Sequence, residues 1–412
     1  MSTNGKPYDS KSSGETARGG GGGRGQKRSG EPSLSASLLV IAPLPKPARD
    51  GYDYRVLLLK RSETSTYQSA HVFPGGNVDP IDRDVEAWSS RFPSSTAFTA
   101  GVPMLNEAEM QVVKLCAIRE TFEESGVLLF EPTSSSDHTK QKEVQEKWRK
   151  MDERTKTHLR EKVHSDGKEF VNLFEKELGK EVRPALGKLT HWANWVTPTL
   201  LPRRFDTHFF ITVLPSSSSP ASSPDDTPYY KLASSDGKET SIAEWLTPLQ
   251  AVRRALAHTA GLSYPETTPT YAEQPHSMGN NPTKSIILHP PQFYLLAELA
   301  NNHKSYKSLL DDSGLNVRPR SVRSFTPQIG EVVDEGGKTR RATLLPGDES
   351  FVAPGEGGEK GKKGARHRTY VIPPNQKTQG LTVLGVHRRG LVDEGPGWED
   401  MQAGDVGQLA KL

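Results

Sequence analysis

Three glutamates within five residues, Glu120, Glu123 and Glu124, have the types and spacing best suited to chemistry in this sequence. The surrounding segment predicts a helix, and side chains three and four positions apart share one helix face. Such carboxylates repel each other by roughly 0.2–0.5 kcal/mol per exposed pair, and they lie towards the helix C-terminus, where the helix dipole disfavours negative charge. A divalent cation removes this conflict, and ligands that are all oxygen favour Mg²⁺ or Mn²⁺. The pattern therefore predicts a metal site formed by the three glutamates.

The rest of this helix agrees with a site rather than with a uniformly solvated surface. Arg119 lies four residues before Glu123, so the two side chains are spaced for an ion pair. The opposite stripe is apolar and must face a core; it consists of Leu115, Ile118 and Phe122. Acidic triplets are also common on exposed helices, so a solvated acidic face is the alternative for the triplet alone.

Both helices and strands are expected to position these residues. Asn106, with Glu109 three residues later, predicts a capped helix start, and Gly126 predicts its end. Further helices are expected at 248–260 and 290–302, and strands at 36–42, 55–60, 192–197, 205–214, 229–232 and 242–246. Two strand-like pieces near the end of the chain, 369–372 and 381–387, predict a hairpin. The pattern indicates a protein of the α/β class.

Composition sets the domain organisation that we expect. Only 33% of the 412 residues are hydrophobic, and there are 37 glycines and 31 prolines, which predicts one sizeable core plus long solvated segments. We expect a disordered Gly-rich and basic tail at 1–32 and one folded domain at 33–302. Within that domain we expect an inserted loop near 83–105 and a charged helical insertion near 131–190. Residues 303–412 are expected to form a polar, partly disordered extension.

Charge and cysteine content exclude several classes of protein. A net charge of +3 demands neither nucleic acid nor a membrane surface as a partner, and Cys116 is the only cysteine, so an internal disulfide is excluded. There is no apolar run near the roughly 20 residues of a membrane span, and no apolar segment typical of a secretory signal at the start. The sequence closes with Ala410-Lys411-Leu412, a variant of the Ser-Lys-Leu tripeptide that the peroxisomal import receptor binds. We expect a peroxisomal protein, with the cytoplasm as the alternative.

The spacing around the acidic helix resembles the Nudix box. That family's motif joins a glycine and an acidic residue to an Arg-Glu pair, a Glu-Glu pair and a final glycine with an aliphatic residue. Here Gly76 matches the first glycine, and Asp82 stands where the motif has its first glutamate. Arg119-Glu120, Glu123-Glu124 and Gly126-Val127 match the rest, and residues 83–118 stand where the motif has a much shorter segment, so the box contains an insertion. Whether Asp79 or Asp82 takes the part of the first acidic residue is left open. The resemblance implies an α/β/α sandwich with a mixed sheet, and metal-dependent hydrolysis of a diphosphate bond in which Glu120, Glu123, Glu124 and Arg119 take part.

A box split in this way is similar to that of the peroxisomal acyl-coenzyme A diphosphatase branch of the family. Four further segments carry the likeness: residues 69–76, 192–198, 203–210 and 244–248. The branch implies coenzyme A or acyl-coenzyme A as substrate, and 3′,5′-ADP and (acyl-)phosphopantetheine as products. The residues expected at the substrate are the backbone of Gly75 and Gly76, which allows close approach, and the side chains of Arg61, Arg203 and Arg204.

Several alternatives stay open at the level of sequence. The general base is one of the helix glutamates, Glu239 or Glu244, and ion pairing is an equal alternative for the three arginines. The aromatic residues Trp192, Trp195, Phe209 and Phe210 are expected in the core. The substrate could instead be ADP-ribose, a nucleotide sugar or a dinucleoside polyphosphate. A protein of this fold that binds a ligand without catalysis is a further alternative.

Overall fold

A mixed eight-stranded sheet is the centre of the computed structural model. The structure describes residues 30–62, 69–92, 107–134, 138–201, 203–215, 233–260, 286–314, 316–334, 336–355, 358, 360–372, 382–389 and 401–402. The sheet has the order β10-β7-β8-β1-β2-β3, while β4 pairs with β1 and β9 with β2. Its strands are β1 (Ser33–Pro43), β2 (Tyr54–Arg61), β3 (His71–Val72), β4 (Gly75–Asn77), β7 (Thr190–Val196), β8 (Phe205–Val213), β9 (Thr240–Leu246) and β10 (Ser324–Phe325).

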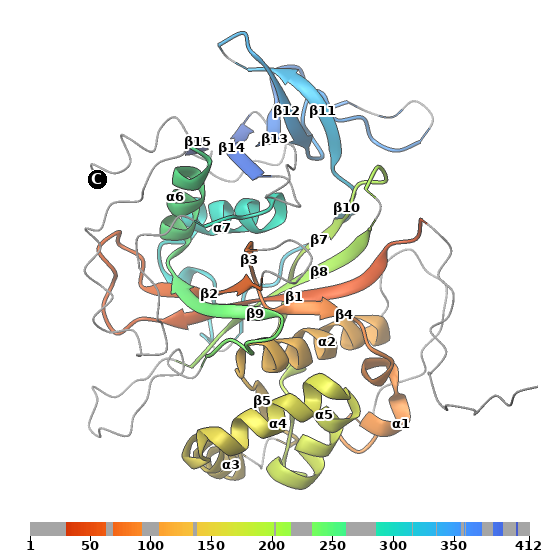
Figure 1. Cartoon of the computed structure of the whole chain (residues 1–412), viewed down its shortest axis with the longest axis vertical. Helices are drawn as coiled ribbons and strands as arrows, with labels where there is room; N and C mark the ends of the chain where they lie inside the picture. Colours follow the sequence, from red (N-terminus) through yellow and green to blue (C-terminus); the bar gives the residue numbers. More distant parts are fainter. Residues whose placement is uncertain are drawn as a thin grey trace, which may run out of the picture.

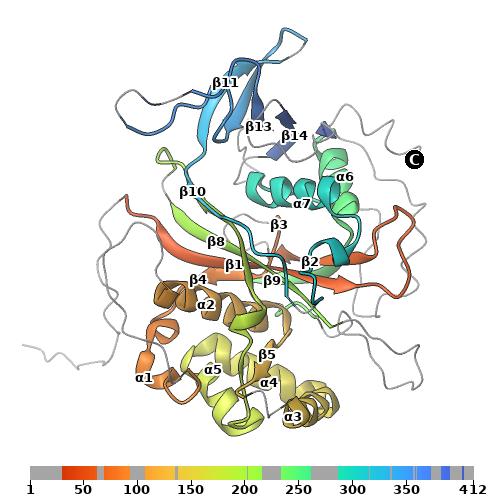
Figure 2. The ribbon, with the colours of Figure 1, turned by 180° about the vertical axis from the view of Figure 1, so that it is seen from behind.

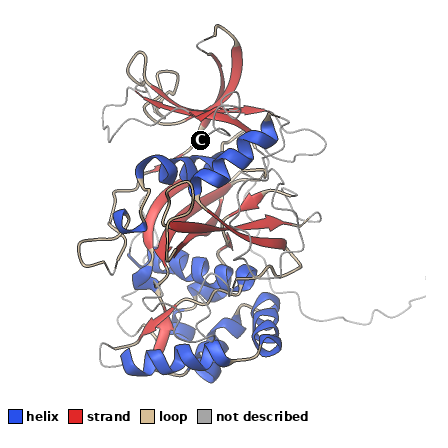
Figure 3. Cartoon of the chain, turned by 90° about the vertical axis from the view of Figure 1, so that its left-hand side faces the viewer, coloured by secondary structure: helices blue, strands red, loops and turns tan. Residues whose placement is uncertain are grey.

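Both faces of this sheet are covered, which explains why β1 is almost continuously buried. Leu38 and Val40 point to the face covered by α2 (Glu107–Ser125), whereas Leu39 and Ile41 point to the face covered by α6 (Pro248–Thr259) and α7 (Pro290–Asn302). Figure 1 and Figure 3 show the resulting layers of helix, sheet and helix. The expected α/β sandwich with a mixed sheet is confirmed.

Helix α2 has the predicted course. Its apolar stripe of Leu115, Ile118 and Phe122 is buried, and Gly126 ends it in the left-handed conformation, with φ 73°. The expected cap, Asn106, lies outside the described residues. The predicted core strands and both later helices are present at the expected residues. The strand predicted at 229–232 lies outside the described residues.

The segment expected as a loop near 83–105 begins with ordered structure instead. A 3₁₀ turn at Pro80–Arg83 leads into the short helix α1 (Val85–Trp88). Trp88 is buried against the aromatic rings of Phe170 and Phe174, with centroids 5.9 and 6.2 Å away. The polar composition of this segment did not predict the turn and helix α1, because the buried Trp88 packs against residues far along the chain.

The charged segment after α2 folds into a helical layer on the outer side of that helix. Strands β5 (Phe130–Pro132) and β6 (Val182–Pro184) pair with each other. Between them in the sequence lie α3 (His138–Lys150), α4 (Glu153–Ser165), α5 (Lys168–Asn172) and a π-helical turn at Leu173–Leu178. A 3₁₀ turn at Leu186–Lys188 then leads into β7. Figure 2 shows this layer below α2, on the side opposite the C-terminal strands.

The C-terminal part contains more structure than the expected hairpin. The predicted pair is present as antiparallel β13 (Arg366–Ile372) and β14 (Thr382–Arg389). It belongs to a five-stranded sheet with β11 (Gln328–Val333), β12 (Thr339–Leu344) and β15 (Met401–Gln402). Val371, Val383 and Val386 pack into the core that contains α6 and α7. None of the helices among the described residues is long and apolar enough to cross a bilayer.

Candidate active site

The last two turns of α2 lie against strand β4 at the centre of the site. The backbone amide of Gly75 donates a hydrogen bond to Oε2 of Glu124 at 2.9 Å. A Cβ atom on Gly75 would lie 2.3 Å from the carbonyl oxygen of Ala36, and one on Gly76 would lie 2.5 Å from the carboxyl carbon of Glu120. Gly75 therefore requires glycine, because its neighbour is backbone, whereas a Cβ atom on Gly76 would displace the carboxylate of Glu120. The two glycines allow β4 to approach the glutamates closely.

Arg119 is the buried cation that organises the acidic residues. Its Nε and Nη2 donate to the two carboxylate oxygens of Asp82, each at 2.9 Å, and its Nη1 donates to Glu123 at 2.6 Å and lies 3.1 Å from Glu120. The predicted pair of Arg119 with Glu123 is confirmed. Asp82 therefore joins the site across the insertion, by holding Arg119 in a two-point ion pair. Asp79 caps the 3₁₀ turn and lines the cavity described below.

The carboxylates outnumber the cations that neutralise them. Burial raises the pKa of Glu120 to about 8; Arg119 opposes this shift, whereas Glu123 and Asp82 reinforce it. Burial also raises the pKa of Glu124 well above its ordinary value, and the nearby charge of Glu120 adds to the effect. The pKa of Glu123 is raised by burial too, against the attraction of Arg119. The cluster therefore lacks positive charge, most of all between Glu120 and Glu124.

This donor set fits a hard divalent cation in its chemistry. All the groups are carboxylate oxygens that line one cavity. Burial is the main cause that raises the pKa values of Glu120 and Glu124, and a bound cation would favour their ionised forms. Within the described residues, no group of three His, Cys, Asp or Glu side chains already surrounds a single ion position. The three glutamates would therefore have to change side-chain conformation to share one ion.

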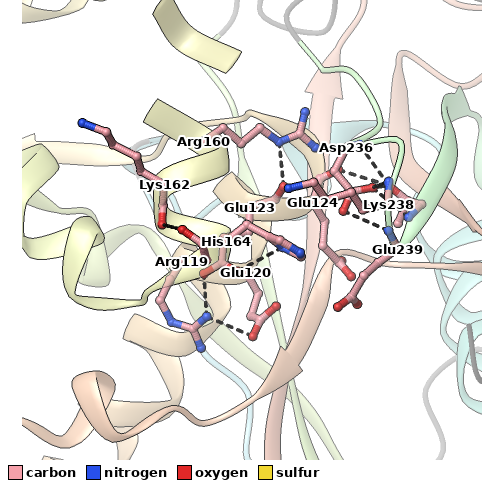
Figure 4. A network of polar contacts seen from close by, with 12 residues as sticks. Arg119, Glu120, Glu123, Glu124, Arg160, Lys162, His164, Asp236, Lys238 and Glu239 are labelled. Atoms are coloured by element: carbon pink, nitrogen blue, oxygen red, sulfur yellow. Dashed lines mark hydrogen bonds and ion pairs between the residues drawn. The ribbon is translucent and has the colours of Figure 1, made fainter. Parts of the chain in front are cut away.

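The helical layer supplies residues that the motif does not contain. His164, at the end of α4, has its Nδ1 3.8 Å from Oε2 of Glu123 and lines the cavity. Arg160, one turn earlier, donates from Nε to the backbone carbonyl of Glu123 at 2.6 Å and from Nη1 to Ser234 at 3.2 Å (Figure 4). Sequence reasoning missed both residues, because nothing in their local spacing indicates that α4 returns to α2.

Glu239 faces the same cavity from the turn before β9. Asp236 accepts hydrogen bonds from the backbone amides of Lys238, Glu239 and Thr240, and the Thr240 hydroxyl donates to the carbonyl of Glu124 at 3.4 Å (Figure 4). The turn is thus fastened to the end of α2. Glu244, the other expected base outside the helix, is instead paired with Arg254 at 2.6 Å and does not line the cavity. Its position does not support a catalytic role.

The three arginines expected at the substrate separate into two groups. Arg61 and Arg203 line the cavity, and Arg61 lies 3.9 Å from Glu239. Arg204 does not line it, because its guanidinium donates to the backbone carbonyls of Thr197 at 3.0 Å and Gly30 at 2.6 Å. The expected substrate contact of Arg204 is therefore corrected to a structural role.

The cavity has a volume of about 1000 Å³ and extends well beyond the acidic cluster. That volume is at the upper end of the roughly 300–1,000 Å³ typical of small-molecule sites. The expected core aromatics Trp192, Trp195, Phe209 and Phe210 are all buried, as predicted. Trp195 and Phe209 also line the cavity, which the sequence did not indicate.

Comparisons with known proteins give one consistent result. Residues 108–267 match the family model described as NUDT19 Nudix domain. The chain is 29% identical over 384 residues to acyl-coenzyme A diphosphatase NUDT19 of Xenopus laevis, covering 85% of this chain and 84% of that protein. It is 29% identical over 347 residues to the protein of the same name from Homo sapiens, covering 75% of each. A solved Nudix hydrolase from Alicyclobacillus acidocaldarius is 21% identical with a TM-score of 0.38, covering 58% of this chain and 88% of that one.

Proposed function

The chain is a Nudix hydrolase, and on that premise we propose that it hydrolyses the diphosphate bond of coenzyme A and acyl-coenzyme A. The products would be 3′,5′-ADP and phosphopantetheine or its acyl thioester. The observation that carries the proposal is the position of the acidic cluster, which opens into a cavity large enough for a substrate much longer than a diphosphate. The activity named for the relatives from Xenopus laevis and Homo sapiens, acyl-coenzyme A diphosphatase, supports the choice of substrate.

Each residue of the cluster has a role in this reaction. Glu120, Glu123 and Glu124 would hold divalent cations, Mg²⁺ or Mn²⁺, whose chemistry is to neutralise the diphosphate and to acidify water for attack on phosphorus. Arg119 positions Glu120 and Glu123 through the ion pairs that it makes with them, and Asp82 fixes its guanidinium. Arg61 and Arg203 line the cavity and would bind phosphate oxygens.

Glu239 is the base that the geometry favours outside the helix. Its turn is fixed to α2, and its side chain is half exposed at the cavity wall, so it can exchange a proton with solvent after accepting one from water. Replacing Glu239 with glutamine should therefore lower kcat by about 100-fold or more with Tm maintained, because a general base typically contributes roughly 10²–10⁴-fold. A kcat close to that of the wild type would assign the base to one of the helix glutamates.

A substrate panel tests the proposed function. The protein would be incubated with coenzyme A, lauroyl-coenzyme A, ADP-ribose and diadenosine tetraphosphate, each with Mg²⁺ or Mn²⁺, and the nucleotide products would be identified. We expect 3′,5′-ADP from both coenzyme A substrates. A preference of tenfold or more for ADP-ribose would overturn the proposal that coenzyme A compounds are the substrates. If no compound is hydrolysed, the result would favour a protein that only binds its ligand.

We also propose that the protein is imported into peroxisomes through Ala410-Lys411-Leu412, residues that lie outside the described part of the chain. The test is a fusion with a fluorescent protein at the N-terminus, expressed with and without these residues. Punctate fluorescence that overlaps a peroxisomal marker should become diffuse on deletion. Fluorescence that stays punctate would contradict the proposal.

A further inference from the structure

The cavity has a largely apolar half whose purpose the acidic cluster does not explain, although Arg203 also lines the cavity from the connection between β7 and β8. We call this half the apolar arm; it is lined by Trp195, Leu201, Phe205, Phe209, Pro291 and Pro327. These residues come from β7, β8, the connection between them, the first turn of α7 and the segment before β11. Three separate parts of the chain, the β7–β8 segment, α7 and the segment before β11, therefore converge on one apolar wall.

The apolar arm is joined to the acidic cluster by neighbouring strands. Phe209 of β8 is paired with Ser37 of β1, Ser37 is paired with Gly75 of β4, and the Gly75 amide donates to Glu124. Two strand spacings separate Phe209 from Gly75, which is roughly 10 Å. Phe209 packs with the α6 and α7 face of the sheet, whereas Glu124 comes from α2 on the other face, and one cavity is lined by both residues. A ligand with its diphosphate at Glu124 would reach the arm through that cavity.

The wall is held in place by packing against the rest of the core. The ring of Trp195 lies 5.6 Å from that of Tyr294 in α7 and 4.8 Å from that of Phe325 in β10, and the ring of Phe209 lies 6.4 Å from that of Phe73. These contacts fix the shape of the wall before a ligand binds, which reduces the entropy lost on binding.

Two further features indicate the kind of ligand. Thr343 of β12 lines the cavity and is only 3% exposed, and its hydroxyl has no hydrogen-bond partner within the described part of the chain. A buried hydroxyl of this kind is unfavourable unless a ligand satisfies it. At the other extreme, Leu200, beside Leu201, is 80% exposed, the highest value among the exposed large hydrophobic residues that the structure describes. Apolar surface therefore continues from the arm to the protein surface.

We propose that the apolar arm binds the acyl-pantetheine half of the substrate, with pantetheine along Phe209 and Thr343 and the acyl chain against Leu200 and Leu201. Pantetheine is uncharged and carries amides that can satisfy the Thr343 hydroxyl, and the acyl chain is apolar. The inference rests on the proposed function and adds a specificity site to it. The C-terminal sheet, through Thr343, would then be part of the substrate site.

The acyl part of the proposal is tested at the exposed end of the arm. The double variant Leu200→Ser/Leu201→Ser changes two residues of a surface connection, and Val333→Ser is the matched control, an exposed aliphatic residue that does not line the cavity. The measurement is kcat/KM for lauroyl-coenzyme A and for free coenzyme A. We expect the ratio of the two to fall about tenfold in the double variant, with free coenzyme A changed less than twofold, and to stay constant in Val333→Ser.

The pantetheine part is tested with Thr343→Val, which removes the hydroxyl and keeps the shape. KM for free coenzyme A should rise severalfold with kcat and Tm maintained, because among the described residues the hydroxyl has no hydrogen-bond partner to lose. An unchanged ratio of the two kcat/KM values in the double variant would overturn the proposal that the apolar arm binds the acyl-pantetheine half, and so would an unchanged KM in Thr343→Val. Either result would leave coenzyme A turnover, and so the proposed function, intact. A wild-type protein that hydrolyses ADP-ribose and no coenzyme A compound would instead overturn the proposed function and the arm with it.

Discussion

At the scale of single residues, the site is an excess of buried carboxylate around one guanidinium. Arg119 forms short ion pairs with Asp82 and Glu123 and a longer one with Glu120. Glu124 instead accepts a hydrogen bond from the backbone amide of Gly75. Repulsion within such a cluster is unfavourable for folding, and a protein retains it when a ligand cation compensates. The same groups should therefore govern activity, metal affinity and pH dependence together.

Glu123→Gln should reduce kcat by about 100-fold or more without unfolding the protein. The amide cannot supply the negative oxygen of a metal ligand, and the loss should exceed the roughly 10–100-fold typical of residues that only orient ligands. Arg119 keeps its partners Asp82 and Glu120, so the thermal transition should remain. Glu153→Gln, at a solvent-exposed carboxylate on α4, is the control. Unchanged kcat in Glu123→Gln would contradict the role of the acidic cluster.

The metal-free protein should lose stability as the pH rises. Burial raises the pKa of Glu120 from 4.5 to about 8, so the folded state holds a proton that the unfolded state has released between these values. Stability is therefore greatest below about pH 4.5 with respect to this group, and falls as the pH approaches 8. Mg²⁺ should raise Tm most at the upper end, because the cation replaces the proton. Scanning calorimetry in a chelator and in Mg²⁺ measures both trends, and a Tm independent of pH and metal would refute this account.

Sequence reasoning at this scale depended on local spacing. The three glutamates, Arg119 and the two glycines could be predicted because two adjacent helical turns and one short strand contain them. The role of Arg204 could not, because its guanidinium is used by backbone carbonyls from Thr197 and Gly30. His164 reaches the site only through the path of α4, and no pattern in one sequence encodes that path.

At the scale of elements, the helical layer is a support of the site as well as an addition to the fold. Arg160 of α4 donates to the last turn of α2 and to the segment that leads to Glu239, so one side chain joins three parts of the chain. The helices of this layer were predictable from their periodicity, because each has an apolar stripe. Their attachment was not, because it depends on a buried arginine that binds backbone atoms.

Replacing Arg160 with methionine should separate the helical layer from the end of α2. We expect kcat to fall about tenfold, because residues that position a metal ligand typically contribute 10–100-fold. KM should change less, since Arg160 does not line the cavity. Arg154→Met, at an exposed position of the same helix, is the matched control. An Arg160→Met enzyme with wild-type kcat would show that α4 supports the fold alone.

At the scale of the whole molecule, the C-terminal sheet and the catalytic layers share one core. The Thr259 hydroxyl of α6 donates to the carbonyl of Val383 at 2.8 Å, and the Tyr294 hydroxyl of α7 is 2.8 Å from Nε2 of His367. The sequence could not predict this sheet beyond β13 and β14. Its strands are rich in arginine and threonine, and part of their charge is paired within the C-terminal region, as in the buried pair of Arg368 with Asp348.

Shared packing predicts that damage to this sheet destabilises the enzyme as a whole. Val386 of β14 is buried in the core with α6 and α7, so Val386→Asp places a carboxylate among apolar side chains, and we expect a loss of about 4 kcal/mol in the free energy of unfolding. Val333→Asp, at an exposed position of β11, should change it by less than about 0.5 kcal/mol. Denaturant titration followed by both tryptophan fluorescence and residual activity should give a single shifted transition for Val386→Asp. Two separate transitions, with activity retained through the first, would instead mean that the C-terminal sheet folds independently of the catalytic layers.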